Sequence, residues 1–94
     1  MKPDEIQSIL VQMAALLRVG SRHEWADVYE NLAAEIAINS HGTARKILDS
    51  YGGAGSLNDV VLQHNGKLLR AENDQFDALR SRLHMLCLKM IRAT

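Results

Sequence analysis

Apolar residues recur at helical spacing from Pro3 to Val19, and this pattern predicts the first helix. Pro3 suits the first helical position, and the two acidic residues that follow it complement the positive end of the helix dipole. We expect Gly20 to end the helix in a left-handed conformation. The predicted apolar face consists of Ile6, Ile9, Leu10, Met13, Leu16 and Leu17.

A second helix is predicted to begin at Ser21 and to run to about Asn39. Ser21 and Glu24 have the spacing of a capping box, in which each side chain binds a backbone amide of the first turn. The expected core stripe is Trp25, Val28, Tyr29, Leu32 and Ile36. The opposite side carries Glu24, Asp27, Asn31 and Glu35.

A brief break at Ser40 to Gly42 precedes a shorter predicted helix, Thr43 to Tyr51, with Gly52 as its stop. Its expected buried residues are Ala44, Ile47, Leu48 and Tyr51.

Two short apolar runs follow, Val60 to Leu62 and Leu68 to Leu69, with His64-Asn65-Gly66 between them. Asn-Gly between apolar runs is a strong hairpin signal, so we favour a two-stranded β-hairpin. The alternative is a short helix capped by Ser56 and Asp59, because S-x-x-D precedes an apolar run.

The last predicted helix extends from about Asn73 to Arg92. Phe76, Leu79, Leu83, Leu86 and Met90 have the spacing of a packing seam. Its second half is apolar nearly all round, so we expect it to be central in the fold or covered by a partner. A homodimer through this helix is one such arrangement.

Length and composition predict one mainly α domain over residues 1–94: a small four-helix bundle with a hairpin before the last helix. Apolar residues make up 47% of the chain, and 11 basic residues balance 11 acidic ones. This balance does not favour nucleic acid or an anionic membrane as a partner. One cysteine and the lack of an apolar leader favour a cytoplasmic protein.

The sequence from Tyr51 to Asp59 is rich in turn-forming residues: Gly52, Gly53, Gly55, Ser56, Asn58 and Asp59. Closely spaced glycines can cradle a phosphate, but the P-loop and dinucleotide-binding patterns are both absent. We therefore interpret the segment as a structural turn, and keep a small-ligand or nucleotide site at residues 52–59 as an alternative.

No catalytic or metal-binding constellation is evident. The four histidines, His23, His41, His64 and His84, lack metal-ligand spacing. Cys87 lies three residues after His84, but a thiol between two leucines is typical of an inert buried residue. We expect no cofactor and no enzymatic activity.

Residues 21 to 39 carry four acidic residues and one basic residue, which suits them to steering a basic partner. The candidate partner-binding residues are Glu24, Asp27, Tyr29, Asn31 and Glu35.

The run Y-G-G-A-G-S-L-N-D-V-V-L, from Tyr51 to Leu62, resembles the YGGxGSxNDxVL signature of a family of short bacterial proteins of unknown function. The L-L-R-x-G run ending at Gly20, Trp25, and the segment from Glu72 to Arg80 are also similar. The resemblance implies helices on both sides of the motif and brings no catalytic residues with it. Small bacterial proteins of this kind are often immunity proteins, so it favours neutralisation of a cognate toxin by direct binding. A homodimeric structural or regulatory domain is the alternative.

Overall fold

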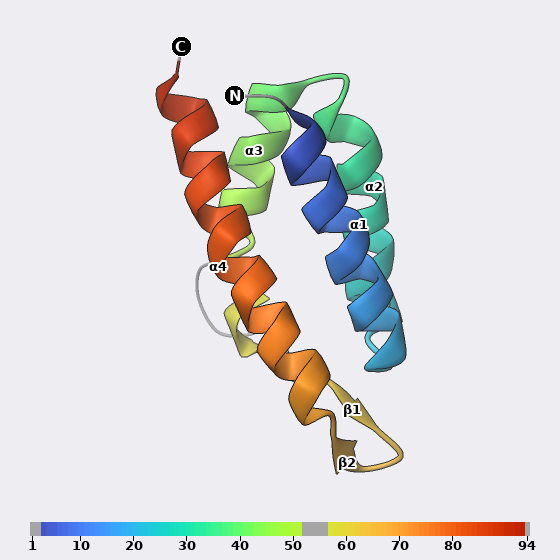
Figure 1. The fold of residues 1–94 in the computed structure, drawn as a ribbon. Helices are drawn as coiled ribbons and strands as arrows, with labels where there is room; N and C mark the ends of the chain where they lie inside the picture. Colours follow the sequence, from blue (N-terminus) through green and yellow to red (C-terminus); the bar gives the residue numbers. More distant parts are fainter. Residues whose placement is uncertain (1–2, 52–56, 94) are drawn as a thin grey trace.

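The computed structural model describes residues 3–51 and 57–93, which form a mainly helical fold (Figure 1). The helices of this part of the chain are α1 (Pro3–Val19), α2 (His23–Ile36), α3 (Ser40–Asp49) and α4 (Arg70–Arg92). A 3-10 turn, η1 (Leu57–Asp59), and a hairpin of β1 (Gln63–His64) and β2 (Lys67–Leu68) lie between α3 and α4. The predicted four-helix fold with a hairpin before the last helix is confirmed.

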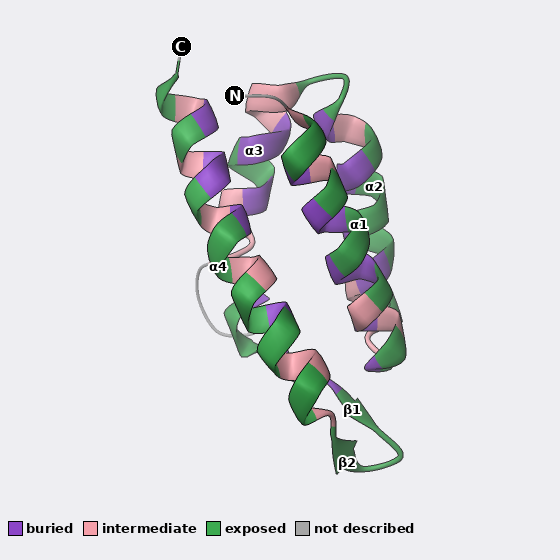
Figure 2. Cartoon of the chain, in the orientation of Figure 1, coloured by how far each residue is buried: buried purple, intermediate pink, exposed green. Residues whose placement is uncertain are grey.

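The hydrophobic core lies along the contacts that α1 and α4 make with the neighbouring helices (Figure 2). Helix α1 packs against α2 and α4, and α3 packs against α2 and α4. Glu5 of α1 and Arg82 of α4 form an ion pair across one of these seams. Because α4 is longer than the other helices, its first turns extend past the bundle toward the hairpin (Figure 1).

The junction of α1 and α2 differs from the prediction by one residue. Ser21, not Gly20, adopts the left-handed conformation, with φ 61°. Arg22 N donates to Leu17 O at 2.8 Å and Ser21 N to Arg18 O at 3.1 Å, which is the hydrogen-bond pattern of a Schellman motif centred on Ser21. A residue with positive φ cannot serve as the extended N-cap of the next helix, so the predicted capping box with Glu24 does not form.

Gly20 has a steric role instead. A Cβ atom built there would lie 2.6 Å from Leu62 Cδ2 and 2.8 Å from Leu62 Cβ. Leu62 is fully buried, so glycine at this position lets the segment before the hairpin approach the end of α1.

Helix α2 ends at Ile36, three residues before the predicted end, and α3 begins at Ser40. The cause is Asn39, whose side-chain oxygen accepts a hydrogen bond from Gly42 N at 3.2 Å and so caps α3. The break predicted at residues 40–42 therefore lies at residues 37–39.

The buried face of α2 is rotated slightly from the predicted stripe. Tyr29, Leu32 and Ile36 are buried as expected, but Val28 is 46% exposed. Ala26 and Ala33, which were not predicted to be buried, lie in the core. Trp25 is half-buried, with its ring edge-on to Tyr29 at a centroid distance of 6.1 Å.

The hairpin is confirmed, with strands at Gln63–His64 and Lys67–Leu68 instead of the predicted Val60–Leu62 and Leu68–Leu69. Gln63 pairs with Leu68, and His64 pairs with Lys67. Asn65 and Gly66 have φ values of 51° and 77°, which a type I′ turn requires. The predicted strand from Val60 to Leu62 is instead an irregular segment that buries Val60 and Leu62 in the core and exposes Val61. Of the alternative capped helix, η1 is present and Ser56 lies outside the described residues.

Asn73, in the first turn of α4, forms hydrogen bonds with the backbone of the segment that contains Leu62. Its Oδ1 accepts a hydrogen bond from Leu62 N at 2.9 Å, and its Nδ2 donates to Leu62 O at 2.9 Å and to Leu69 O at 2.7 Å. The side-chain amide thus pairs with the backbone as a neighbouring strand would. Helix α4 begins at Arg70, three residues before the predicted start, because Asn73 N already donates to Leu69 O.

Among the described helices, none combines the length and the apolar character needed to span a membrane.

Candidate functional site

The structure places one predicted contact residue in the core. Tyr29 has no exposed surface and therefore cannot touch a partner, which corrects the prediction. Ser50 Oγ donates to Ile47 O at 2.6 Å, so the hydrogen bond of 3.0 Å between Tyr29 Oη and Ser50 Oγ has Tyr29 as donor. Burial raises the pKa of Tyr29 well above its usual range.

The acidic side chains of α2 are largely paired with bases from neighbouring helices. Arg18, at the end of α1, binds Asp27 at 2.6 Å and Glu30 at 2.8 Å. The hydrogen bond from Arg18 lowers the pKa of Glu30. Lys46 of α3 binds Glu35 at 3.0 Å.

Of the acids on the outer side of α2, Glu24 alone makes no ion pair within residues 3–51 and 57–93. The acidic excess read from residues 21–39 is therefore partly compensated by bases that the sequence places outside that segment. Arg18 and Lys46 were missed because a sequence does not show which charges of other helices reach a given face.

Two large apolar side chains lie among these acids. Val28 is 46% exposed and Ile38, just after the end of α2, is 87% exposed. At about 100° per residue, Val28 points to the same side of α2 as Asn31, and Ile38 lies two residues beyond the last residue of the helix. We call this surface the α2 face; it consists of Glu24, Asp27, Val28, Asn31, Glu35 and Ile38.

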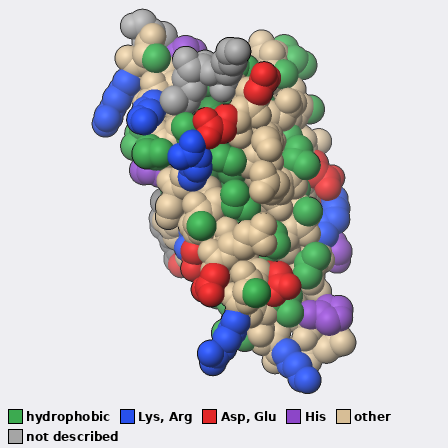
Figure 3. Space-filling model, viewed as in Figure 1, with side chains coloured by type: hydrophobic (Ala, Val, Ile, Leu, Met, Phe, Trp, Pro, Cys, Tyr) green, Lys and Arg blue, Asp and Glu red, His purple; other side chains and the backbone are tan. Residues whose placement is uncertain are grey.

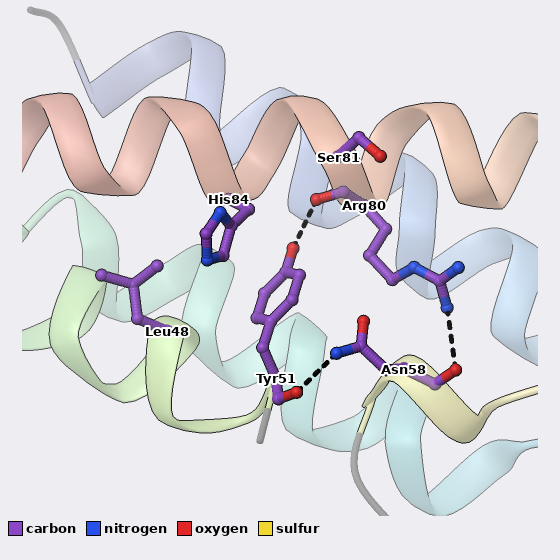
Figure 4. Close-up of a pocket in the computed structure, with 6 residues that line it drawn as sticks. All are labelled: Leu48, Tyr51, Asn58, Arg80, Ser81 and His84. Atoms are coloured by element: carbon purple, nitrogen blue, oxygen red, sulfur yellow. Dashed lines mark hydrogen bonds between the residues drawn. The ribbon is translucent and has the colours of Figure 1, made fainter. Parts of the chain in front are cut away.

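A hollow of about 610 Å³ lies between α3, η1 and α4 (Figure 4). The residues that line it are Leu48, Tyr51, Asn58, Arg80, Ser81 and His84. The rings of Tyr51 and His84 lie against each other, with centroids 4.9 Å apart. Burial raises the pKa of Tyr51 above its usual range.

The polar groups of this hollow hold the ends of the Gly-rich segment (Figure 4). Tyr51 Oη donates to Arg80 O at 2.6 Å, and Asn58 Nδ2 donates to Tyr51 O at 2.5 Å. The Arg80 guanidinium donates to Leu57 O at 3.3 Å and to Asp77 at 2.6 Å. Residues on both sides of the segment are thus anchored at Arg80.

This arrangement favours the structural interpretation of the turn. The Asn58 amide and the Arg80 guanidinium, the strongest donors in the hollow, already bind groups of the protein. Gly52, Gly53, Gly55 and Ser56 lie outside the described residues, and the Asp59 side chain is exposed. Arg80 was not identified as an anchor because a helix pattern marks it only as a surface residue.

Cys87 is buried and does not have the properties of a nucleophilic cysteine. Burial raises its pKa to about 12, so the thiolate is not formed near neutral pH. In the part of the chain that the structure describes, no cluster of three His, Cys, Asp or Glu side chains could hold a metal ion.

We expect native Cys87 to resist iodoacetamide at about pH 8, and to react fully in urea, because only the thiolate is alkylated. Its folded pKa is raised, so its contribution to stability is complete below the unfolded pKa of about 8.5 and is lost as the pH rises toward 12. Ala15→Cys, at an exposed position on α1, supplies a reactive reference thiol. Native Cys87 reacting as fast as that reference would contradict the prediction.

Comparison with known proteins identifies a family. No curated protein and no solved structure matches the chain. The family model described as Domain of unknown function (DUF6966) matches residues 17–70, more than half of the 94 residues. The match runs from the last turn of α1 through α2, α3 and the hairpin to the first residue of α4. The chain is a member of the DUF6966 family.

Proposed function

We propose that this DUF6966 protein is a protein-binding module, specifically an immunity protein that neutralises a cognate bacterial toxin by direct binding. The α2 face is the contact surface. The observation that carries the proposal is the 87% exposure of Ile38, just after α2, together with the exposure of Val28 on the helix itself. Exposed apolar side chains beside charged ones are typical of surfaces that bury against another protein.

Each part of the α2 face has a role in this proposal. Val28 and Ile38 supply contact energy in place of the buried Tyr29. Glu24, which has no internal ion pair among the described residues, and Asp27, which shares Arg18 with Glu30, attract a basic partner, while Glu35 is already paired with Lys46. The partner is thus a toxin with a basic surface that surrounds an apolar depression, and the two proteins meet in the cytoplasm.

The binding of a small ligand in the hollow of Figure 4 is less well supported. Its main donors are already bound to backbone carbonyls and to Asp77, so a ligand would have to displace them. Protein binding requires no such displacement at the α2 face.

The test is the affinity of the chain for the product of a neighbouring secreted-toxin gene, measured by calorimetry, together with protection of cells that express that toxin. We expect Ile38→Asp to weaken binding by about tenfold or more, because a contact residue in an interface core commonly contributes this much. Glu24→Lys should mainly slow association and reduce its dependence on salt.

Matched controls lie on other elements. Leu68→Asp changes a side chain on the hairpin that is 54% exposed, and Asp49→Lys reverses an exposed charge on α3. Both should bind like the wild type. A toxin-gene product that is harmless alone, or does not bind, overturns the proposed function. Equal losses for Ile38→Asp and Leu68→Asp overturn the assignment of the α2 face.

A further inference from the structure

From Asp74 onward, the outer side of α4 carries charges of opposite sign in its two halves. Helix α4 buries Phe76, Leu83, Leu86, Cys87 and Met90 against the bundle. At about 100° per residue, the side opposite these residues is a stripe that runs from Arg70 to Arg92, in which the basic Arg70 precedes the part from Asp74 onward. Figure 2 shows exposed residues along this outer side of α4. We call the part of this stripe from Asp74 onward the α4 face; it consists of Asp74, Asp77, Ala78, Ser81, Met85, Leu88, Lys89 and Arg92.

The first half of the α4 face is acidic and the last part is basic. Asp74 and Asp77 lie at one end, and Lys89 and Arg92 at the other. Figure 3 shows basic side chains at the C-terminal end of α4 and acidic side chains lower on the molecule. Asp74, Lys89 and Arg92 form no ion pair with the described residues. Asp77 binds Arg80 through Oδ1 only, and its side chain is 57% exposed, so its second oxygen is available.

The middle of the α4 face carries only small or apolar side chains. Ala78 and Ser81 are exposed, Met85 is 40% exposed and Leu88 is partly exposed. Small side chains allow another helix to approach closely, and methionine adapts its shape to an apolar partner. A helix that meets this face therefore contacts apolar groups at its centre and charges at its ends.

We propose that the α4 face binds a second copy of this chain, with the two α4 helices antiparallel about a two-fold axis level with Leu83. A rotation of 180° places acidic ends on basic ends, so the face is complementary to itself. In this register Asp74 lies opposite Arg92 of the second copy at the centre of the face, and Asp77 is level with Lys89. Each pair occurs twice.

The same register brings the central residues together. Ala78 is level with Leu88 of the second copy, and Ser81 with Met85, so that each level holds a small side chain and a large one. A parallel arrangement would place Asp74 on Asp74 and Arg92 on Arg92, and like charges in contact are unfavourable. The charge pattern thus selects both the occupant and its direction.

The dimer leaves the α2 face free. Helices α2 and α4 lie on opposite sides of the bundle (Figure 1). The dimer would therefore present two α2 faces pointing away from its axis. This inference is independent of the proposed function, because it depends only on α4.

The test is sedimentation equilibrium from micromolar to high micromolar concentration at low and high salt. The wild type should be a dimer that weakens as salt rises, since its peripheral pairs are exposed to solvent. Asp74→Lys/Asp77→Lys and Lys89→Glu/Arg92→Glu should each raise the dimer Kd by about tenfold or more, because like charges then meet. An equimolar mixture of the two variants should associate, since one face has become wholly basic and the other wholly acidic.

The mixing result separates an interface from a folding defect. Circular dichroism checks that each variant is folded, and Asp74→Lys alone preserves the ion pair of Asp77 with Arg80. Glu24→Lys, on the α2 face, is the control and should leave the dimer Kd unchanged. A wild type that is monomeric at every concentration and salt, or variants that do not associate when mixed, would overturn the inference.

Discussion

Replacing Asn73 with alanine should lower the free energy of unfolding by about 2–3 kcal/mol, because it leaves the Leu62 amide without a partner inside the protein. Asn73 Oδ1 is the acceptor for Leu62 N, and Leu62 is fully buried. The two carbonyls that Asn73 Nδ2 binds retain other donors: Leu69 N binds Leu62 O, and Asn73 N binds Leu69 O. The loss is therefore dominated by one orphaned amide.

Urea denaturation followed by far-UV circular dichroism measures this effect. In a domain of this size the loss should lower Tm by roughly 10 °C or more. Asn31→Ala is the matched control, because it makes the same change on a helix at an exposed position without a hydrogen bond to the described side chains. If both variants lose the same free energy of unfolding, the hydrogen bonds between Asn73 and Leu62 contribute nothing to stability.

The helices of the described chain were predictable because their apolar residues follow a period that only one backbone geometry satisfies. The hairpin turn was predictable for a similar local reason, since Asn65-Gly66 accepts two positive φ values in succession. Both signals are contained within a few residues, so no knowledge of the rest of the chain was needed.

Helix boundaries were harder to predict because they depend on single capping contacts. The sequence offers both Gly20 and Ser21 for the left-handed position, and glycine is the usual choice. The structure uses Ser21, because Gly20 is needed where the segment at Leu62 comes close. Gly20 and Leu62 are 42 residues apart in the sequence, so no local pattern predicts that they come close.

The candidate site depended even more on distant contacts. The acidic side of α2 was visible in the sequence, but Arg18 and Lys46, which neutralise part of it, come from α1 and α3. Tyr29 and Val28 are adjacent, so a rotation of one residue decides which is buried and which can touch a partner. Periodicity fixes a helical face only to within about one residue.

Gly20→Ala should lower the free energy of unfolding by about 2–3 kcal/mol through overpacking. The added Cβ would lie 2.6 Å from Leu62 Cδ2 and 3.0 Å from Leu62 Cα, so a change of rotamer alone cannot relieve the contact. The neighbouring change Ser21→Gly should act in the opposite direction. It removes a non-glycine side chain from a left-handed backbone, which is worth about 0.5–1 kcal/mol after the entropy of glycine is subtracted.

A double-mutant cycle with Leu62→Ala identifies the cause of the Gly20→Ala loss. Leu62→Ala alone should cost about 2–4 kcal/mol, because it opens a cavity in the core. The same substitution removes Cδ2 and frees position 62 to shift, so the double variant should be more stable than the sum of the two losses by about 0.5–1 kcal/mol. Strict additivity would show that Gly20 does not act through the Leu62 side chain beyond Cβ. Opposite signs at Gly20 and Ser21, together with coupling to Leu62, would establish that close approach, and not backbone conformation, requires glycine at position 20.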